Sequence, residues 1–240
     1  APWHPHRGFE TVTYLLDGRM RHEDSAGNNG ELNPGDVQWM TAGRGIIHCE
    51  EPHDEFLKTG GRTHGFQIWV NLPSSHKMME PRYQEVPSTE SPIVEQDGVW
   101  ARVIAGECMG ITSSIDTKIP ITLIHVKMKP ESRLVQQLQA DLNGMIYVFG
   151  GGINLENEIK VKKSPIAFGI GAKQGLQDGE LALLSEGEEI VIESQEGAEF
   201  LILAGPELNE PIERYGPFVM NTKEEIHQAF LDYQNGTLTS

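Results

Sequence analysis

The sequence predicts an all-β protein, and three observations lead to that class. Short runs with apolar side chains at alternating positions recur along the chain, as in residues 11–16, and a period of two is typical of β-strands. Turn signals rich in Gly, Pro, Asn and Asp separate these runs. We find a helical pattern only near residues 222–236. We therefore expect a β-sandwich or barrel that ends in a short helix.

In the N-terminal part, the strand at residues 11–16 is expected to close in a hairpin turn at Asp17-Gly18. A second turn signal lies at residues 33–36, and the glycines of residues 43–45 break the chain before the run that contains His48. Apolar residues alternate over residues 66–72, so we expect half of that strand to face an apolar interior. Together these elements make a predicted first domain, residues 1–86.

A proline-rich polar stretch at residues 87–96 is predicted to be a linker, and residues 97–240 a second β domain. Five strand-like runs occur in that domain: residues 100–104, 122–126, 145–149, 189–192 and 200–203. The final helix is expected to begin at a capping box of Thr222 and Glu225 and to stop at Gly236. His227 lies off the apolar face of this helix and is expected to be exposed.

Two triplets in the first domain predict a metal site. His4-Pro5-His6 and His48-Cys49-Glu50 each carry two polar side chains at positions i and i+2, which a β-strand directs to one face. Two such strands side by side would aim three imidazoles and one carboxylate at a common point. A single His-x-His pair is weak evidence, because surface histidines also pair by chance. Seven of the nine histidines lie in the first 76 residues, so we expect the first domain to carry the chemistry.

The predicted donors suit several metals. Imidazoles with one carboxylate are compatible with iron, manganese, nickel, copper or zinc and leave room for water, oxygen or a substrate. A structural zinc site would more often be closed by cysteines, and the chain has two, Cys49 and Cys108. Strand alternation should turn Cys49 away from the metal. His22, followed by two acidic residues, is expected to be a solvated turn residue, with a supporting role beside the metal ligands as the alternative, and Trp69 a core or pocket-wall residue.

Charge and hydropathy argue against two classes of function. Thirty-five acidic and nineteen basic residues give a formal net charge of -16 and a pI near 4.9. Such a field repels phosphate backbones, so direct nucleic-acid binding is not expected. No apolar run approaches the roughly 20 residues of a transmembrane helix, so no membrane partner is expected. Two cysteines far apart do not make a disulfide framework. We expect a soluble, cytoplasmic protein.

Longer stretches around both triplets resemble the cupin superfamily and, within it, the pirin family. These stretches are His4-Pro5-His6-Arg7-Gly8-Phe9-Glu10-Thr11-Val12, Asn33-Pro34-Gly35-Asp36-Val37-Gln38-Trp39-Met40-Thr41-Ala42-Gly43-Arg44-Gly45-Ile46, Trp69-Val70-Asn71-Leu72 and Gly216-Pro217-Phe218-Val219-Met220-Asn221-Thr222. The resemblance spans almost the whole chain. It implies a bicupin, with two cupin-type antiparallel β-barrels and a metal site in the first barrel only.

In pirins the first motif supplies two histidines and the second a histidine and a glutamate, which carry over onto His4, His6, His48 and Glu50. The implied metal is Fe(II), with other divalent transition metals as alternatives. Glu10 corresponds to a ligand in many other cupins but not usually in pirins, so we expect it only beside the site. Pirins carry strands before their first motif, whereas three residues alone precede His4 here. We expect the first domain to lack those strands and its histidines to be held loosely.

The resemblance implies a quercetin 2,3-dioxygenase that opens a flavonol with O2, in which Glu50 is both a ligand and the base for the flavonol hydroxyl. An alternative is an iron-dependent redox sensor, a transcriptional co-regulator that contacts a transcription factor without obligatory catalysis. That role would add the nucleus to the expected compartments if the source is eukaryotic. A third is a structural bicupin without activity. The acidic composition suits a basic protein partner better than DNA.

Overall fold

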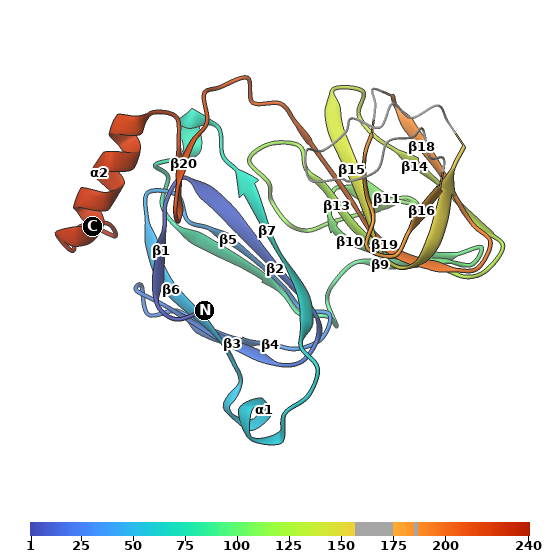
Figure 1. Ribbon diagram of the computed structural model, residues 1–240, viewed down its shortest axis with the longest axis horizontal. Coiled ribbons are helices and arrows are strands. Elements are labelled where there is room, and N and C mark those ends of the chain that lie inside the picture. The colour runs from blue at the N-terminus through green and yellow to red at the C-terminus, as the bar shows by residue number, and fades with distance from the viewer. Residues whose placement is uncertain (157–174, 185–186) are drawn as a thin grey trace. The chain divides into compact units, whose positions relative to one another are not determined.

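The computed structural model describes residues 1–156, 175–184 and 187–240 (Figure 1). Most of these residues lie in β-strands, as predicted. Contacts within the chain divide it into two compact units: residues 1–90 together with 208–240, and residues 91–207. No helix in the described parts combines the length and the apolar character that a membrane crossing requires.

This division differs in part from the predicted domains. The boundary at residues 90 and 91 falls inside the predicted linker, residues 87–96, but the second half of that stretch forms the strand β9 (Ile93–Gln96). Residues 208–240, which the prediction placed in the second domain, contact the first unit instead. The reason is a set of buried apolar and ionic contacts described below, which no local sequence pattern reveals.

Two four-stranded antiparallel sheets face each other in the first unit (Figure 1). One has the strand order β1-β6-β3-β4 and the other the order β7-β2-β5-β8. The strands are β1 (His4–His6), β2 (Phe9–Asp17), β3 (Met20–Asp24), β4 (Asn29–Leu32), β5 (Val37–Thr41), β6 (Ile46–Pro52), β7 (His64–Asn71) and β8 (Arg82–Val86). Helix α1 (Asp54–Thr59) precedes β7, and the 3-10 helix η1 (Ser74–His76) follows it.

One detail of this unit corrects a sequence-based expectation. The turn at Asp17-Gly18 does not close a hairpin, because β2 pairs with β5 and β7 whereas β3 pairs with β4 and β6. A turn signal indicates a change of direction but not which strands pair. Alternation is observed on β7: Phe66, Ile68 and Val70 are half-buried, whereas Gln67 on the other face of the strand donates to Glu50 in the opposite sheet.

After the second unit, the chain returns to the first as the hairpin β20 (Glu213–Tyr215) and β21 (Phe218–Met220), followed by helix α2 (Lys223–Gln234). The helix begins with the predicted capping box of Thr222 and Glu225. A buried cluster packs this segment against Ile47 of β6 and so accounts for its place in the first unit. The cluster consists of Phe218, Met220, Ile226, Ala229 and Leu238.

The buried side chain of Arg7 binds this C-terminal segment to the beginning of the unit. Its Nη1 donates to Asp232 Oδ2 at 2.7 Å and its Nη2 to the Leu238 carbonyl oxygen at 3.3 Å. Its Nε donates to the carbonyl oxygen of Arg44, just before β6. The Val219 N–H also donates to the Arg7 carbonyl oxygen at 3.1 Å. Residue 7 therefore joins the first strands to both β21 and α2.

Lys77, which is 1% exposed, also connects the first strands to the C-terminal hairpin. Its Nζ donates to the Gly8 carbonyl oxygen at 2.8 Å, to Asn71 Oδ1 at 2.6 Å and to the Val219 carbonyl oxygen at 3.0 Å. These acceptors satisfy all three ammonium donors, although loss of hydration on burial lowers the pKa of Lys77 to about 8. Gly8 has φ of 91°, and a Cβ there would lie 2.0 Å from the Val219 carbonyl oxygen, so only glycine permits this approach.

In its described residues the second unit contains a curled nine-stranded sheet with the order β14-β18-β15-β19-β13-β10-β9, in which β16 and β17 also pair with β15, and a separate two-stranded sheet of β11 and β12. The further strands are β10 (Val99–Ala105), β11 (Glu107–Cys108), β12 (Ile111–Thr112), β13 (Thr122–Met128), β14 (Ser132–Gln137), β15 (Leu142–Leu155), β16 (Gly175–Gln177), β17 (Leu181–Leu183), β18 (Glu189–Ser194) and β19 (Ala198–Pro206). The five predicted runs lie in β10, β13, β15, β18 and β19 and are confirmed. An apolar core lies inside the curl and includes Ile124, Ile146 and Ile202.

Candidate metal centre

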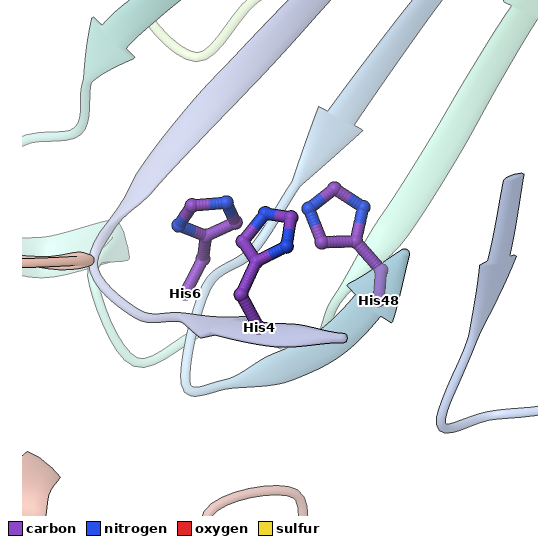
Figure 2. A group of neighbouring side chains, drawn as sticks. All are labelled: His4, His6 and His48. Carbon is purple, nitrogen blue, oxygen red and sulfur yellow. The ribbon is translucent and has the colours of Figure 1, made fainter. Parts of the chain in front are cut away.

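Strands β1 and β6 bring three of the predicted ligands together. They pair antiparallel, with His4 opposite His48 and His6 opposite Ile46, so alternation directs all three imidazoles to one face. The rings gather above the two strands (Figure 2), and their centroids are 4.4 Å apart for His4 and His48, 4.7 Å for His4 and His6, and 5.0 Å for His6 and His48. The spacing of the two triplets was thus sufficient to find these residues.

The ring nitrogens are arranged as metal donors. One nitrogen of each histidine lies within 4.8 Å of the others. Nδ1 of His4 is 2.7 Å from the Pro2 carbonyl oxygen and Nδ1 of His6 is 3.3 Å from that of Pro217, which favours a proton on Nδ1 and a lone pair on Nε2. Within the described parts of the chain, neither nitrogen of the buried His48 has a hydrogen-bond partner. Buried polar atoms are rarely left unpaired, and a metal ion would satisfy all three rings.

The two buried histidines are neutral near pH 7. Burial lowers the pKa of His6 to about 3, helped by His48 and His4. Burial also lowers the pKa of His48 to about 3, with smaller effects of His4 and His22. Because a metal binds the neutral imidazole, these side chains are in their ligating form throughout the physiological pH range.

The fourth predicted ligand, Glu50, lies two residues after His48 on β6 and is buried. It is not one of the close group formed by the three histidines. Its Oε1 accepts a hydrogen bond from Thr13 Oγ1 at 2.9 Å, and its Oε2 accepts one from Gln67 Nε2 at 3.1 Å. A carboxylate has about four acceptor positions, so these donors leave room for a further partner. The ligand role of Glu50 stays a prediction.

Thr13 and Gln67 are site residues that the sequence reasoning missed. They are register partners on β2 and β7, in the sheet opposite the histidines, and both donate to the Glu50 carboxylate. Partners of this kind fix the orientation of a metal-binding group. A weak signal was present in the sequence, because Thr11 and Thr13 give β2 a polar face beside its apolar one.

His22 is buried, contrary to the expectation of a solvated turn residue. It lies in β3, where it is the register partner of Glu50 on one side and Gly30 on the other. Its ring stacks on Tyr83, with centroids 5.8 Å apart, and its Nε2 lies 2.7 Å from a carboxylate oxygen of Glu85. The acidic residues after it suggested solvent, but the strand turns its side chain toward the opposite sheet.

The side-chain directions of Glu10 on β2 and Cys49 on β6 follow the alternation of their strands. The Glu10 carboxylate accepts a hydrogen bond from Thr41 Oγ1 at 2.6 Å, and its position on β2 puts it on the face opposite Thr13 and therefore away from Glu50. Glu10 is thus not beside the metal donors. Cys49 points away from its two neighbours on β6, as predicted, and burial raises the pKa of its thiol.

The first strand is not held loosely, contrary to expectation. On one side β1 pairs with β6. On the other side Arg7 forms a parallel bridge with Phe218, and the Pro217 carbonyl oxygen contacts His6. The partner on this second side comes from the C-terminal hairpin, which is remote in sequence, so the sequence alone gave no sign of it.

The donors present fit a divalent transition metal. Three imidazoles, with a carboxylate two residues along the same strand, form a nitrogen-rich set that suits first-row metals. The identity of the metal does not follow from this set, because iron, nickel and zinc all accept it.

Comparisons with known proteins extend over both structural units. The family model for Pirin matches residues 1–70, and the model for the Pirin C-terminal cupin domain matches residues 123–239. The crystal structure of a quercetin 2,3-dioxygenase from Acinetobacter baumannii has a TM-score of 0.89 at 37% identity, over all of this chain and 79% of that one. A bacterial pirin from Escherichia coli, solved with nickel(II), shares the fold at 21% identity, with a TM-score of 0.63 over 85% of this chain and 75% of that one.

Human pirin is 43% identical over 237 residues, which cover 98% of this chain and 76% of the human protein. Agreement on this scale extends through both structural units. The residues matched by the two family models, 1–70 and 123–239, contain the positions of both triplets and of the C-terminal segment. The chain described here belongs to the pirin family.

Proposed function

We propose that this chain is a metal-dependent flavonol dioxygenase of the quercetin 2,3-dioxygenase type, with Fe(II) held by His4, His6, His48 and Glu50. The observation that carries the proposal is the buried His48, whose two ring nitrogens have no hydrogen-bond partner among the described residues while the imidazoles of His4 and His6 converge on it. The likeness to a quercetin 2,3-dioxygenase at 37% identity supports the reaction class. The expected compartment is the cytoplasm.

Glu50 is the proposed base. Flavonol oxidation begins with loss of the hydroxyl proton, and a buried carboxylate that keeps a free acceptor position can take it. Thr13 and Gln67 donate to this carboxylate and would hold it in one orientation while the proton moves. When bound, the metal supplies the one-electron chemistry needed to combine a flavonol with O2.

A second candidate is an iron-dependent co-regulator that binds a transcription factor and requires no turnover. One observation favours it: the net charge of -16 suits a basic protein partner. Its test is the affinity of ferrous and ferric protein for such a partner. Equal affinities in the two oxidation states would exclude a redox switch, because a state-dependent response needs differential binding.

Elemental analysis of the purified protein is the first experiment, and one equivalent of metal is expected. His48→Ala should lose most of it, because the third imidazole is gone. His227→Ala is the matched control, since His227 is exposed on α2, and it should keep the metal. Metal content near zero in the wild type, even after loading with Fe(II), would support a purely structural protein.

The second experiment follows O2 uptake and loss of flavonol absorbance with Fe(II)-loaded protein and quercetin. Wild type and His227→Ala should turn over, and His48→Ala should not. Glu50→Gln tests the base separately, because an amide keeps the shape but takes up no proton. Loss of turnover with retained metal would support the base, and loss of both would show that Glu50 is chiefly a ligand. Equal turnover by His48→Ala would refute the proposal.

A further inference from the structure

The hairpin β20–β21 brings an arginine to the edge of the metal centre. Arg214 lies on β20, and its guanidinium carbon is 4.8 Å from the centroid of the Trp69 ring. The same hairpin carries Pro217, whose carbonyl oxygen contacts Nδ1 of His6. Gly216 makes the turn between them with φ of 54°, which glycine adopts without strain. One short element therefore contacts a metal-site histidine and also places a cation nearby.

Trp69 connects this cation to the centre. Its ring lies 5.7 Å from that of His6 and 4.4 Å from that of Phe9. It is two residues from Gln67 on β7, so alternation gives it the same face as the side chain that donates to Glu50. Trp69 is nevertheless 40% exposed. An aromatic surface thus runs from the buried histidines to solvent.

Arg214 has no anionic partner in the part of the chain that the structure describes. It is exposed, and its guanidinium lies over the Trp69 ring. Other arginines of the unit pair with glutamates, as the half-buried Arg19 does with Glu31 and the exposed Arg21 with Glu51. An unpaired cation is notable in a chain with thirty-five acidic and nineteen basic residues, because a carboxylate partner was available in abundance.

We propose that Arg214 and Trp69 form a subsite that binds the negative charge of a planar aromatic substrate at the metal centre. The inference rests on the proposed function and narrows its substrate class to aromatic anions. The overall negative field repels such compounds, so a local cation is needed to admit them. The cation–π contact keeps the guanidinium beside the indole, and the N–H donors of a guanidinium can bind a carboxylate or sulfonate through two hydrogen bonds.

The test compares two probes on one scaffold: quercetin, and quercetin that carries a sulfonate on its catechol ring. Binding is measured by calorimetry with zinc-loaded and with metal-free protein, so that no turnover is required. Wild type should bind the sulfonate more tightly than quercetin. Arg214→Gln should weaken sulfonate binding about tenfold, equal to ~1.4 kcal/mol, and change quercetin binding less than twofold. Arg214→Lys should lie between, because it keeps the charge but loses the fork of donors.

Arg21→Gln is the matched control, because it removes the same charge from an exposed strand residue of the same unit. It should leave both probes unaffected. Equal binding of the two probes by wild type, or equal loss of sulfonate binding in Arg21→Gln and Arg214→Gln, would overturn the proposal. Failure of the proposed function is distinguishable from this, because it would appear as absent O2 uptake while the charge preference in binding persists.

Discussion

Replacing Arg7 with methionine should release the C-terminal segment from the first strands. The substitution keeps the aliphatic stem but removes the donors to Asp232, Leu238 and Arg44. Hydrogen bonds from a charged donor contribute roughly 1.5 kcal/mol each, and Asp232, with its side chain 22% exposed, regains part of its hydration. We therefore expect the free energy of unfolding of the first unit to fall by about 3 kcal/mol, the lower end of the range for breaking a buried ion pair.

The same substitution should weaken metal binding. Arg7 follows His6 in the chain and forms a bridge with Phe218, the neighbour of the Pro217 carbonyl that contacts the His6 ring. Loss of a group that orients a ligand lowers metal affinity by about tenfold or more, and we expect an effect of that size. A milder variant, Asp232→Asn, keeps an acceptor for Arg7 and should cost about 1 kcal/mol of stability.

Two measurements check these values. Urea unfolding followed by tryptophan fluorescence reports on the first unit, which contains three of the four tryptophans, and competition with a chromogenic chelator measures zinc affinity. Arg21→Met is the control, since Arg21 belongs to an exposed pair with Glu51, and it should change stability by less than ~1 kcal/mol. If folded Arg7→Met protein binds zinc as tightly as wild type, the C-terminal segment does not position His6 and the reasoning fails.

Three further outcomes are expected. The pKa of Lys77 is lowered from 10.5 to about 8 in the folded protein, so between these values the unfolded state binds more protons and the contribution of this group to stability rises with pH. The difference in unfolding free energy between wild type and Lys77→Met should therefore shift in favour of wild type by about 3 kcal/mol between neutral pH and pH 10.5. Urea titrations that show the same difference at both pH values would contradict this. Gly30→Ala would place a Cβ 2.5 Å from Nε2 of the buried His22 and should lower the free energy of unfolding by about 2 kcal/mol in the same assay. Gly187→Ala is the control: its Cβ would have no atom within 4 Å, and it should leave the free energy of unfolding unchanged. Thr13→Val removes one of the donors to Glu50 and should lower quercetin turnover several-fold while elemental analysis finds the metal unchanged; loss of the metal would instead show that this hydrogen bond maintains the ligands.

The histidines of the metal centre were predictable because their arrangement depends on local alternation. His4 and His6 share a face for the same reason as any residues two apart on a strand, and His48 joins them through one strand pairing. The capping box of α2 was equally local, since Thr222 and Glu225 are three residues apart. Features that require only the period of a strand or the first turn of a helix can be read from neighbouring residues.

The remaining parts of the site depend on contacts between distant segments. The hydrogen bond between His6 and Pro217 spans 211 residues, and a turn or an apolar run carries no information about such a partner. The burial of His22 has the same cause, because its neighbours Tyr83 and Glu85 belong to β8 in the other sheet. Acidic residues next to His22 in sequence were therefore a poor guide to its surroundings.

The pairing of Arg7 with Asp232 has a consequence for biosynthesis. The two residues are 225 positions apart, and at roughly 5–20 residues per second of translation the second leaves the ribosome about 10–45 seconds after the first. During that interval strand β1 has no β21 beside it, and the carbonyl oxygen that orients the His6 ring is absent. The second unit, whose strands are contiguous in sequence, can fold before the first is complete. Stable acquisition of a metal by this protein is therefore expected to be a late, post-translational event.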